Sequence, residues 1–244
     1  MSTPDNNSTA VQSATGSQNE SGTHRLQSTW TFWFDKKNKS KNVSYADNLI
    51  NTISFSTIED FWRSYVHLVK ASVLPKEANI HLFRSGLTPM WETFPKGGCH
   101  IKKVRKGDPN LTVLWEELMV ALIGEAFEDP DVVGIVLSIR QKEDVISVWN
   151  ADCCNFSLRP RLNEVLKSVW GAENCGGIEY KTHNASMKDR STYRTRGNSV
   201  DVVAAEKVIA AAENNATEKN GSAEKTEEKK EEEKEQPTAG EKSG

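Results

Sequence analysis

The sequence predicts an α+β domain in which an antiparallel sheet carries helices on one face. Three observations support this class. Segments with strand periodicity outnumber helical ones, short polar turns join neighbouring strands as hairpins, and three segments show an amphipathic helical pattern. A sheet covered on one side by helices is the two-layer arrangement that buries all these apolar stripes. Exposed aromatic residues are then expected on the open face or at its rim.

The first strand is predicted at Ser28–Phe34, where apolar and smaller residues alternate. This alternation puts Trp30, Phe32 and Phe34 on one face and Thr31 and Trp33 on the other. The basic stretch 35–42 reads as an exposed loop, and 48–55 as a second strand.

A helix over about 57–70 should follow, because Ser56 and Glu59 have the spacing of a capping box. Phe61 would then point inward, while Trp62 lies on an adjacent stripe.

The middle of the chain supplies two further strands and a second helix. Ile80–Phe83 and Cys99–Arg105 have strand character, with a turn at Gly86 between them. Asp108-Pro109 offers an N-cap and a first helical residue for an amphipathic helix over about 110–127.

A long apolar run, Val132–Arg140, predicts a central strand. A polar turn leads into Val145–Asn150, which completes a hairpin. A third helix is expected from Pro160 to a stop at Gly171, followed by a last strand, Gly177–His183. The stretch 184–199 is basic and polar.

Composition separates one folded domain from two tails. Residues 1–23 are rich in Ser, Thr, Asn and Gln, and residues 201–244 carry 12 acidic residues against 7 lysines. Neither segment has enough apolar surface to offset the entropy of ordering, so both are predicted to be disordered. The domain would span 24–200, which contains all seven Trp.

The sequence has no apolar run near 18 residues and no secretory signal pattern, so we expect a cytoplasmic protein without a membrane span. The four Cys have no zinc-ligand spacing, and we expect reduced thiols, no metal and no cofactor. No nucleophile elbow, phosphate loop, paired-His motif or carboxylate pair stands out. The prediction is a non-enzymatic protein.

A binding site is indicated by Trp91 and Glu92, which follow the Gly86 turn. An aromatic face attracts a cationic ring, and a carboxylate accepts two parallel N–H bonds from it. Tyr45 in a polar loop could be a second stacking face, and Arg140 at a strand end suits phosphates. The alternative reading of these residues is a core Trp beside a solvated Glu and an ordinary surface cation.

The chain resembles the messenger-RNA cap-binding initiation factor 4E family. The motifs that carry the resemblance occur in the family's order and spacing: 24–34, 57–65, 81–92, Gly97-Gly98, 115–127 and 133–149. The resemblance implies a curved antiparallel sheet, with three long helices on its convex face and a cap-binding slot on its concave face.

The resemblance also implies a role for each matching residue. Trp91 would stack on 7-methylguanine opposite Tyr45, and Glu92 would accept the N1 and N2 protons of the base. Trp149 would pack near the N7 methyl group. Arg140 would contact the triphosphate, with Lys142 nearby.

Two departures from the family pattern point to a divergent class, the 4E homologous protein. Tyr45 replaces the usual Trp, with a short insertion, and Val145 replaces a phosphate-binding basic residue. Cys99-His100 follows the Gly pair in place of a basic residue and a Trp. Trp30, in contrast, matches the conventional class. Weaker cap binding than in a conventional member is expected.

The resemblance further implies a partner surface on the helical back for a Tyr-X4-Leu-hydrophobic helix of scaffold factor 4G or a 4E-binding repressor. Its matching residues are His24, Ile58, Trp62, Glu117, Leu118 and Val120.

The leading hypothesis is a monomer that binds capped mRNA and links it to translation factors, either promoting or repressing initiation. The alternative is an interaction module that has lost cap binding and keeps only the helical surface. A cap-hydrolysing enzyme is less favoured, because no metal-binding carboxylates were found.

Overall fold

The computed structural model describes residues 22–37 and 44–191. The described residues leave out most of the two predicted tails, residues 38–42 of the predicted basic loop, residue 43 and residues 192–200.

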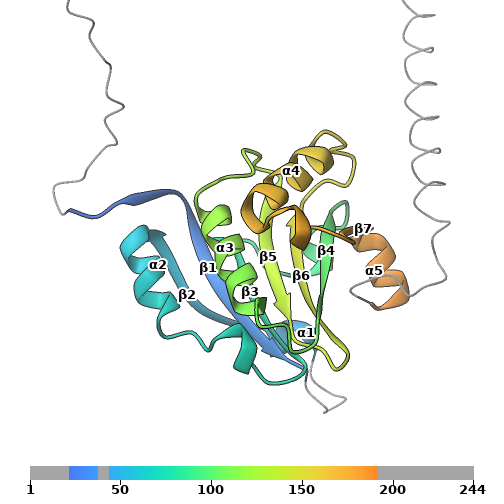
Figure 1. The fold of residues 1–244 in the computed structure, drawn as a ribbon, viewed down its shortest axis with the longest axis horizontal. Helices are drawn as coiled ribbons and strands as arrows, with labels where there is room; N and C mark the ends of the chain where they lie inside the picture. The colour runs from blue at the N-terminus through green and yellow to red at the C-terminus, as the bar shows by residue number, and fades with distance from the viewer. Residues whose placement is uncertain (1–21, 38–43, 192–244) are drawn as a thin grey trace, which may run out of the picture. The chain divides into compact units, whose positions relative to one another are not determined.

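The described chain forms one antiparallel sheet of seven strands in the order β2-β1-β3-β5-β6-β4-β7 (Figure 1). The bounds are β1 Arg25–Lys36, β2 Ile50–Thr57, β3 Ala78–Arg84, β4 Gly98–Arg105, β5 Val132–Ser138, β6 Glu143–Asn150 and β7 Glu179–Thr182. Strand β5 is the middle strand and is buried along its whole length, as its continuous apolar run predicts. The antiparallel α+β class predicted from the sequence is confirmed.

Three helices, α2 (Ile58–Tyr65), α3 (Leu111–Ile123) and α4 (Leu158–Trp170), cover the same face of this sheet (Figure 1). We call it the helix face, and the opposite one the open face. Two short helices, α1 (Tyr45–Asn48) and α5 (His183–Asp189), and three 3₁₀ turns complete the structure: η1 Ala71–Val73, η2 Trp91–Thr93 and η3 Ala172–Asn174. Among the described residues, none of the helices combines the length and apolar character needed to cross a bilayer.

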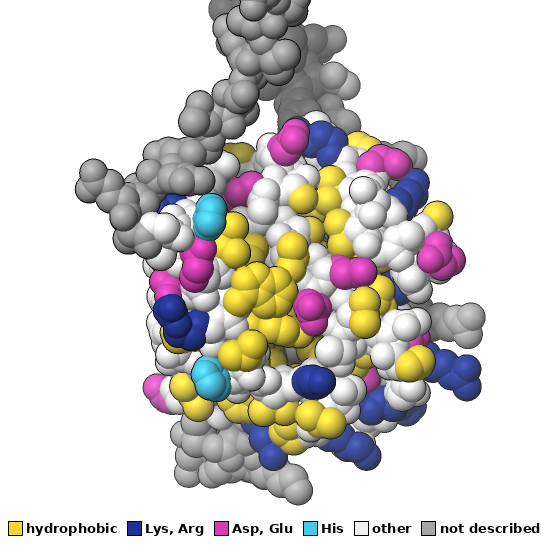
Figure 2. Space-filling view, turned by 60° about the vertical axis from the view of Figure 1, so that its left-hand side comes forward, with side chains coloured by type: hydrophobic (Ala, Val, Ile, Leu, Met, Phe, Trp, Pro, Cys, Tyr) yellow, Lys and Arg dark blue, Asp and Glu magenta, His cyan; other side chains and the backbone are white. Residues whose placement is uncertain are grey.

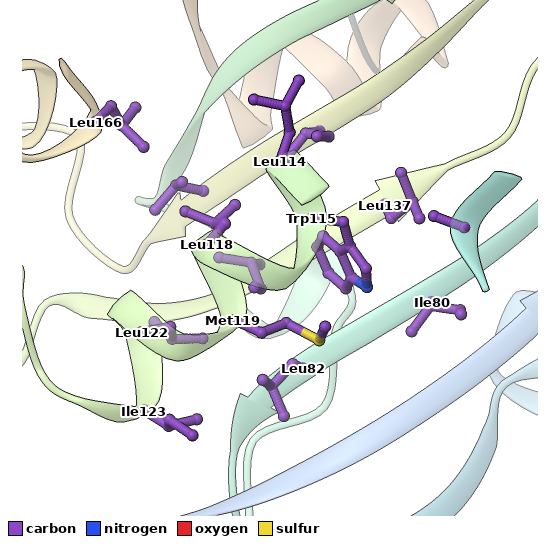
Figure 3. Packing of buried hydrophobic residues seen from close by; sticks show 14 of the residues in the cluster. Ile80, Leu82, Leu114, Trp115, Leu118, Met119, Leu122, Ile123, Leu137 and Leu166 are labelled. Atoms are coloured by element: carbon purple, nitrogen blue, oxygen red, sulfur yellow. The ribbon is translucent and has the colours of Figure 1, made fainter. Parts of the chain in front are cut away.

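The main core lies between the sheet and the helices. Because side chains alternate along a strand, Ile80 and Leu82 of β3 enter this core while His81 and Phe83 face the other way. Figure 3 shows α3 packed on Ile80, Leu82 and Leu137, with Leu166 of α4 beside it. The strand prediction for 28–34 is confirmed: Trp30 and Phe32 are buried in this core.

A second, smaller hydrophobic cluster lies on the open face. Its buried members are Phe83, Phe94, Cys99, Ile101, Val133, Val136, Val145 and Trp149, and Trp33, Leu87 and Trp91 pack against it. The open face is therefore not a plain polar surface, since it holds a partly covered aromatic floor.

The first helix departs from the prediction. Thr57, not Ser56, is the N-cap, and its hydroxyl accepts the amide N–H of Asp60 at 3.1 Å. Glu59 instead accepts hydrogen bonds from the His24 backbone and ring at 3.0 and 2.7 Å, which holds the start of β1. Helix α2 has 8 residues and is not long, because the chain tightens into turns after Tyr65.

Three further boundaries differ. Helix α3 begins at Leu111 with Asn110 as N-cap, because the Asp108 carboxylate accepts the Asn110 N–H at 2.9 Å in a local turn. Helix α4 begins two residues before Pro160. Helix α5, predicted only as part of a polar stretch, is capped by Thr182, whose hydroxyl accepts the Ala185 N–H at 3.2 Å.

Candidate functional site

The open face is organised in rows of side chains that cross the strands. Strand register places Asp35, Asn79, Ser138, Val145 and Lys103 in one row. A second row places Phe83, Gly134, Trp149, Cys99 and Lys181 at the other end of the same strands. The open face thus has a polar end and an aromatic end.

Tyr45 stands at the polar end as the first residue of α1, which Ser44 caps by accepting the Asp47 N–H at 3.2 Å. The Tyr45 side chain is 45% exposed, while its hydroxyl donates to the buried carboxylate of Asp35 at 3.3 Å. Burial of the hydroxyl end, together with the Asp35 charge, raises the pKa of Tyr45. The charges of Arg140 and Glu92 also act on this pKa, so both residues lie within electrostatic reach of Tyr45.

Trp91 and Glu92 lie in η2, after the Gly86 turn. The Trp91 ring packs against the open-face cluster and is half-buried, whereas Glu92 is exposed. Two backbone hydrogen bonds stabilise the turn: the Phe94 N–H donates to the Trp91 carbonyl at 3.1 Å, and the Gly97 N–H donates to the Phe94 carbonyl at 2.9 Å. These bonds hold the backbone that carries Trp91 and Glu92.

Trp149 forms part of the floor beneath this turn. It is buried, and its ring meets Phe83 edge-on at 5.4 Å and His183 at 4.3 Å between centroids. The His183 ring in turn donates from Nδ1 to the Phe94 carbonyl at 3.0 Å. Burial lowers the pKa of His183 to about 4, so the imidazole is neutral near pH 7.

Cations gather where β5 turns into β6. The Asp144 carboxylate accepts the Arg140 backbone N–H at 3.2 Å and pairs with Lys106 at 2.7 Å, which fixes the shape of this turn. The Arg140 guanidinium bonds the Ile139 carbonyl at 3.3 Å, and Lys142 is exposed beside it. Lys103 lies opposite Val145 in the strand register and pairs with Glu179 at 3.2 Å.

The structure therefore brings Tyr45, Glu92 and Arg140 into one electrostatic neighbourhood, with Trp91 next to Glu92. Three residues around this neighbourhood were missed: Asp35, His183 and Lys103. Alternation along 99–105 could have revealed Lys103, since it shares a face with Ile101. Asp35 and His183 carry no local signal, because only the tertiary fold brings them to Tyr45 and Trp149.

The predicted partner residues lie around α2 and α3 on the helix face. Ile58, Trp62 and Val120 are each at least 40% exposed, although they are large hydrophobic side chains. His24 and Glu117 are also exposed, and the Ile58 N–H donates to the His24 carbonyl at 2.9 Å. Figure 2 shows an apolar area bordered by acidic side chains on the side of the molecule where α2 lies.

Leu118 is a correction to this set. It is fully buried, because its position on α3 points into the main core rather than outward. The outward stripe of α3 includes Glu116, which accepts the Tyr65 hydroxyl bond at 2.6 Å and ties α3 to α2.

Comparison with known proteins gives the family of the chain. A profile described as Eukaryotic initiation factor 4E matches residues 25–198. The chain is 36% identical over 177 residues to the eukaryotic translation initiation factor NCBP of Arabidopsis thaliana, covering 71% of this chain and 79% of that protein. It is 34% identical over 174 residues to the eukaryotic translation initiation factor isoform 4E of Nicotiana tabacum, covering 69% and 84%.

A solved structure shows the same fold. The eIF4E-3 protein of C. elegans, in complex with the 4E-binding protein Mextli and a cap analog, superimposes with a TM-score of 0.63 at 31% identity. The match covers 68% of this chain and 96% of that one.

Fold and matches together define a non-enzymatic translation initiation factor, as the sequence predicted. The chain belongs to the eukaryotic initiation factor 4E family.

Proposed function

We propose that this protein binds the 7-methylguanosine cap of messenger RNA in the slot between Tyr45 and Trp91 on the open face. The observation that carries the proposal is what gathers on the open face. Trp91 packs against its aromatic cluster and precedes the exposed Glu92, while the Tyr45 hydroxyl is bonded to Asp35 at the polar end. Arg140 lies in the turn from β5 to β6. These residues combine aromatic rings, an exposed carboxylate and a cation, which are the groups that a methylated purine nucleotide needs. A related protein, eIF4E-3 of C. elegans, has been solved with a cap analog.

The chemistry of the base accounts for the residue types. Methylation at N7 makes the purine cationic, and a cationic ring stacks well on electron-rich aromatic faces. The same charge makes N1–H a stronger donor to Glu92, and a charge-assisted pair is roughly twice as strong as a neutral one. Trp149 would lie near the methyl group as part of the floor. Selectivity for methylated guanine then follows from charge rather than shape.

The phosphates would bind at the polar end, with Arg140 as the principal contact and Lys142 nearby. Val145 is fully buried and cannot supply the second cation of conventional members. Its cross-strand neighbour Lys103 offers an ammonium group on the same face, and we assign it the missing contact.

We assign the chain to the divergent class of the family, the 4E homologous protein type. Tyr45 and Val145 favour that class, and the similarity to NCBP is compatible with it. Trp30 and the similar match to isoform 4E are marks of the conventional class. We expect a lower affinity for the cap than in conventional members, whether the protein promotes or represses initiation.

The exposed apolar area around Trp62 supports a second activity, the binding of a Tyr-X4-Leu-hydrophobic helix of scaffold factor 4G or a 4E-binding repressor. Relatives have been solved with 4E-binding proteins. The protein would thus link capped mRNA to translation factors in the cytoplasm, as a monomer without cofactor, through a domain spanning 24–200. An interaction module without cap binding is the competing function, since this area does not depend on the open face.

Retention on a 7-methyl-GTP resin tests the proposal. We expect the purified chain to bind at low salt and to elute with free cap analogue but not with GTP. Flow-through at low salt, with the protein folded by circular dichroism, would contradict cap binding and favour the interaction module.

A further inference from the structure

A buried polar cluster lies at the hydroxyl end of Tyr45. Asp35 at the end of β1 is 2% exposed, and its carboxylate accepts hydrogen bonds from Asn79 at 2.8 Å and from the His81 ring at 2.7 Å. The third donor is the Tyr45 hydroxyl, at 3.3 Å. Two donors come from the neighbouring strand, and the third comes from α1.

A buried carboxylate at this place needs an explanation. Removing a carboxylate from water costs free energy unless hydrogen-bond donors satisfy it. Apolar residues of similar volume at such a position often make a protein at least as stable as the buried charged group does. The neighbours of this cluster on the next strand are the buried Ser138 beside Asn79 and the apolar Val136 beside His81. Asn79 bonds Oδ1 of this carboxylate, and His81 bonds Oδ2. The Tyr45 hydroxyl shares Oδ2 with His81, so Tyr45 is tied to a carboxylate that the sheet already holds in place.

We propose that Asp35 is a specificity-determining residue that positions Tyr45 and makes its ring a better partner for a cationic base. This inference rests on the proposed function. A phenol that donates to a carboxylate gains electron density on its ring, and the ring face then attracts a positive charge more strongly. A neutral guanine gains little from this change. The hydrogen bond from Tyr45 to Asp35 would offset the smaller stacking area of a Tyr ring at a position where conventional members have Trp.

Two features of the geometry support this role. The raised pKa of Tyr45 reflects burial of its hydroxyl and the nearby Asp35 charge, so the phenol remains a donor. The bond from Tyr45 is longer than the 2.7 Å bond from His81, so it has room to shorten when a cation stacks on the ring.

The test compares two variants, Asp35→Asn and Tyr45→Phe, by titrating tryptophan fluorescence with 7-methyl-GTP and with GTP. Tyr45→Phe keeps the ring and removes only the hydroxyl. We expect the ratio of the two affinities to fall roughly two- to fivefold in each variant, with GTP binding unchanged. The double variant should lose no more than either single variant, because both changes interrupt one hydrogen bond.

Tyr65→Phe is the matched control, since Tyr65 also donates to a carboxylate, that of Glu116, but on the helix face. It should keep the wild-type ratio. If Asp35→Asn fails to fold, the affinity ratio of Tyr45→Phe alone tests the proposal. An unchanged ratio in Tyr45→Phe, with the wild-type chain binding 7-methyl-GTP, overturns the role of Asp35 only. Failure of the wild-type chain to bind overturns the proposed function as well.

Discussion

At the scale of single residues, Glu92 is the side chain on which the proposed recognition of the base depends most. It is exposed, and within the described ranges no hydrogen bond or ion pair engages its carboxylate. Glu92→Gln keeps the size of the side chain but turns one acceptor toward the base into a donor. We expect 7-methyl-GTP affinity to fall about 10- to 100-fold, which corresponds to one lost charged hydrogen-bonding group.

The comparison for Glu92→Gln is Glu117→Gln on the exposed side of α3. Both variants should melt at the wild-type temperature, because neither carboxylate is buried. Calorimetric titration with 7-methyl-GTP measures the effect. Equal affinity in the Glu92 variant and the Glu117 variant would remove Glu92 from the site.

At the scale of elements, the alternation of β4 decides what each of two neighbouring lysines can do. Lys103 shares the open face with Ile101, whereas the ammonium of Lys102 donates to the Gly176 carbonyl at 2.8 Å on the other side. We expect Lys103→Met to weaken binding of 7-methyl-GTP about three- to tenfold, with no change for the phosphate-free nucleoside 7-methylguanosine. Lys102→Met should change neither affinity. Parallel titrations of both ligands measure this, and a loss for the nucleoside too would mean that Lys103 acts on the fold.

The packing of α5 over η2 gives a second prediction at this scale. Burial lowers the pKa of His183, and separately of His100, to about 4. Because the unfolded chain takes up these protons near pH 6.5 and the folded chain does not, folding stability is fully present above about pH 6.5. The free energy of unfolding should fall by roughly 3 kcal/mol for each histidine between pH 6.5 and 4. Urea unfolding at pH 7 and pH 5 checks this. Equal stability of the wild-type chain at the two pH values would contradict the prediction, and so would a pH dependence that His183→Gln does not reduce.

At the scale of the whole molecule, the sheet separates two surfaces. The proposed cap slot lies on the open face, and the apolar area around Trp62 lies on the helix face. Trp62 is 40% exposed and meets Tyr65 edge-on, so its removal should leave the core intact. Trp62→Ala should weaken binding of a Tyr-X4-Leu peptide about 30-fold or more, as expected for an exposed aromatic anchor, and should keep 7-methyl-GTP retention unchanged. Loss of both activities would show that Trp62 supports the fold.

The sequence by itself determined the architecture and singled out the pair Trp91-Glu92 of the proposed site. Periodicity in the strands and in α3 follows from burial on one face, which is a local pattern, and Trp91-Glu92 stands out as a pair along the chain. Helix ends were less predictable, because competing local bonds decide them: Glu59 binds His24 rather than closing a capping box.

Only the tertiary structure decided which side chains meet. Asp35 lies 10 residues from Tyr45 and 46 from His81. The pairing of β1 with β3 brings Asp35 to His81, and the position of α1 brings Tyr45 to both. The same holds for Lys103 opposite Val145, and for Leu118, whose direction depends on how α3 is rotated on the sheet. These contacts join distant parts of the chain, and hydrophobic periodicity records which face is buried but not which residue from another strand lies against it.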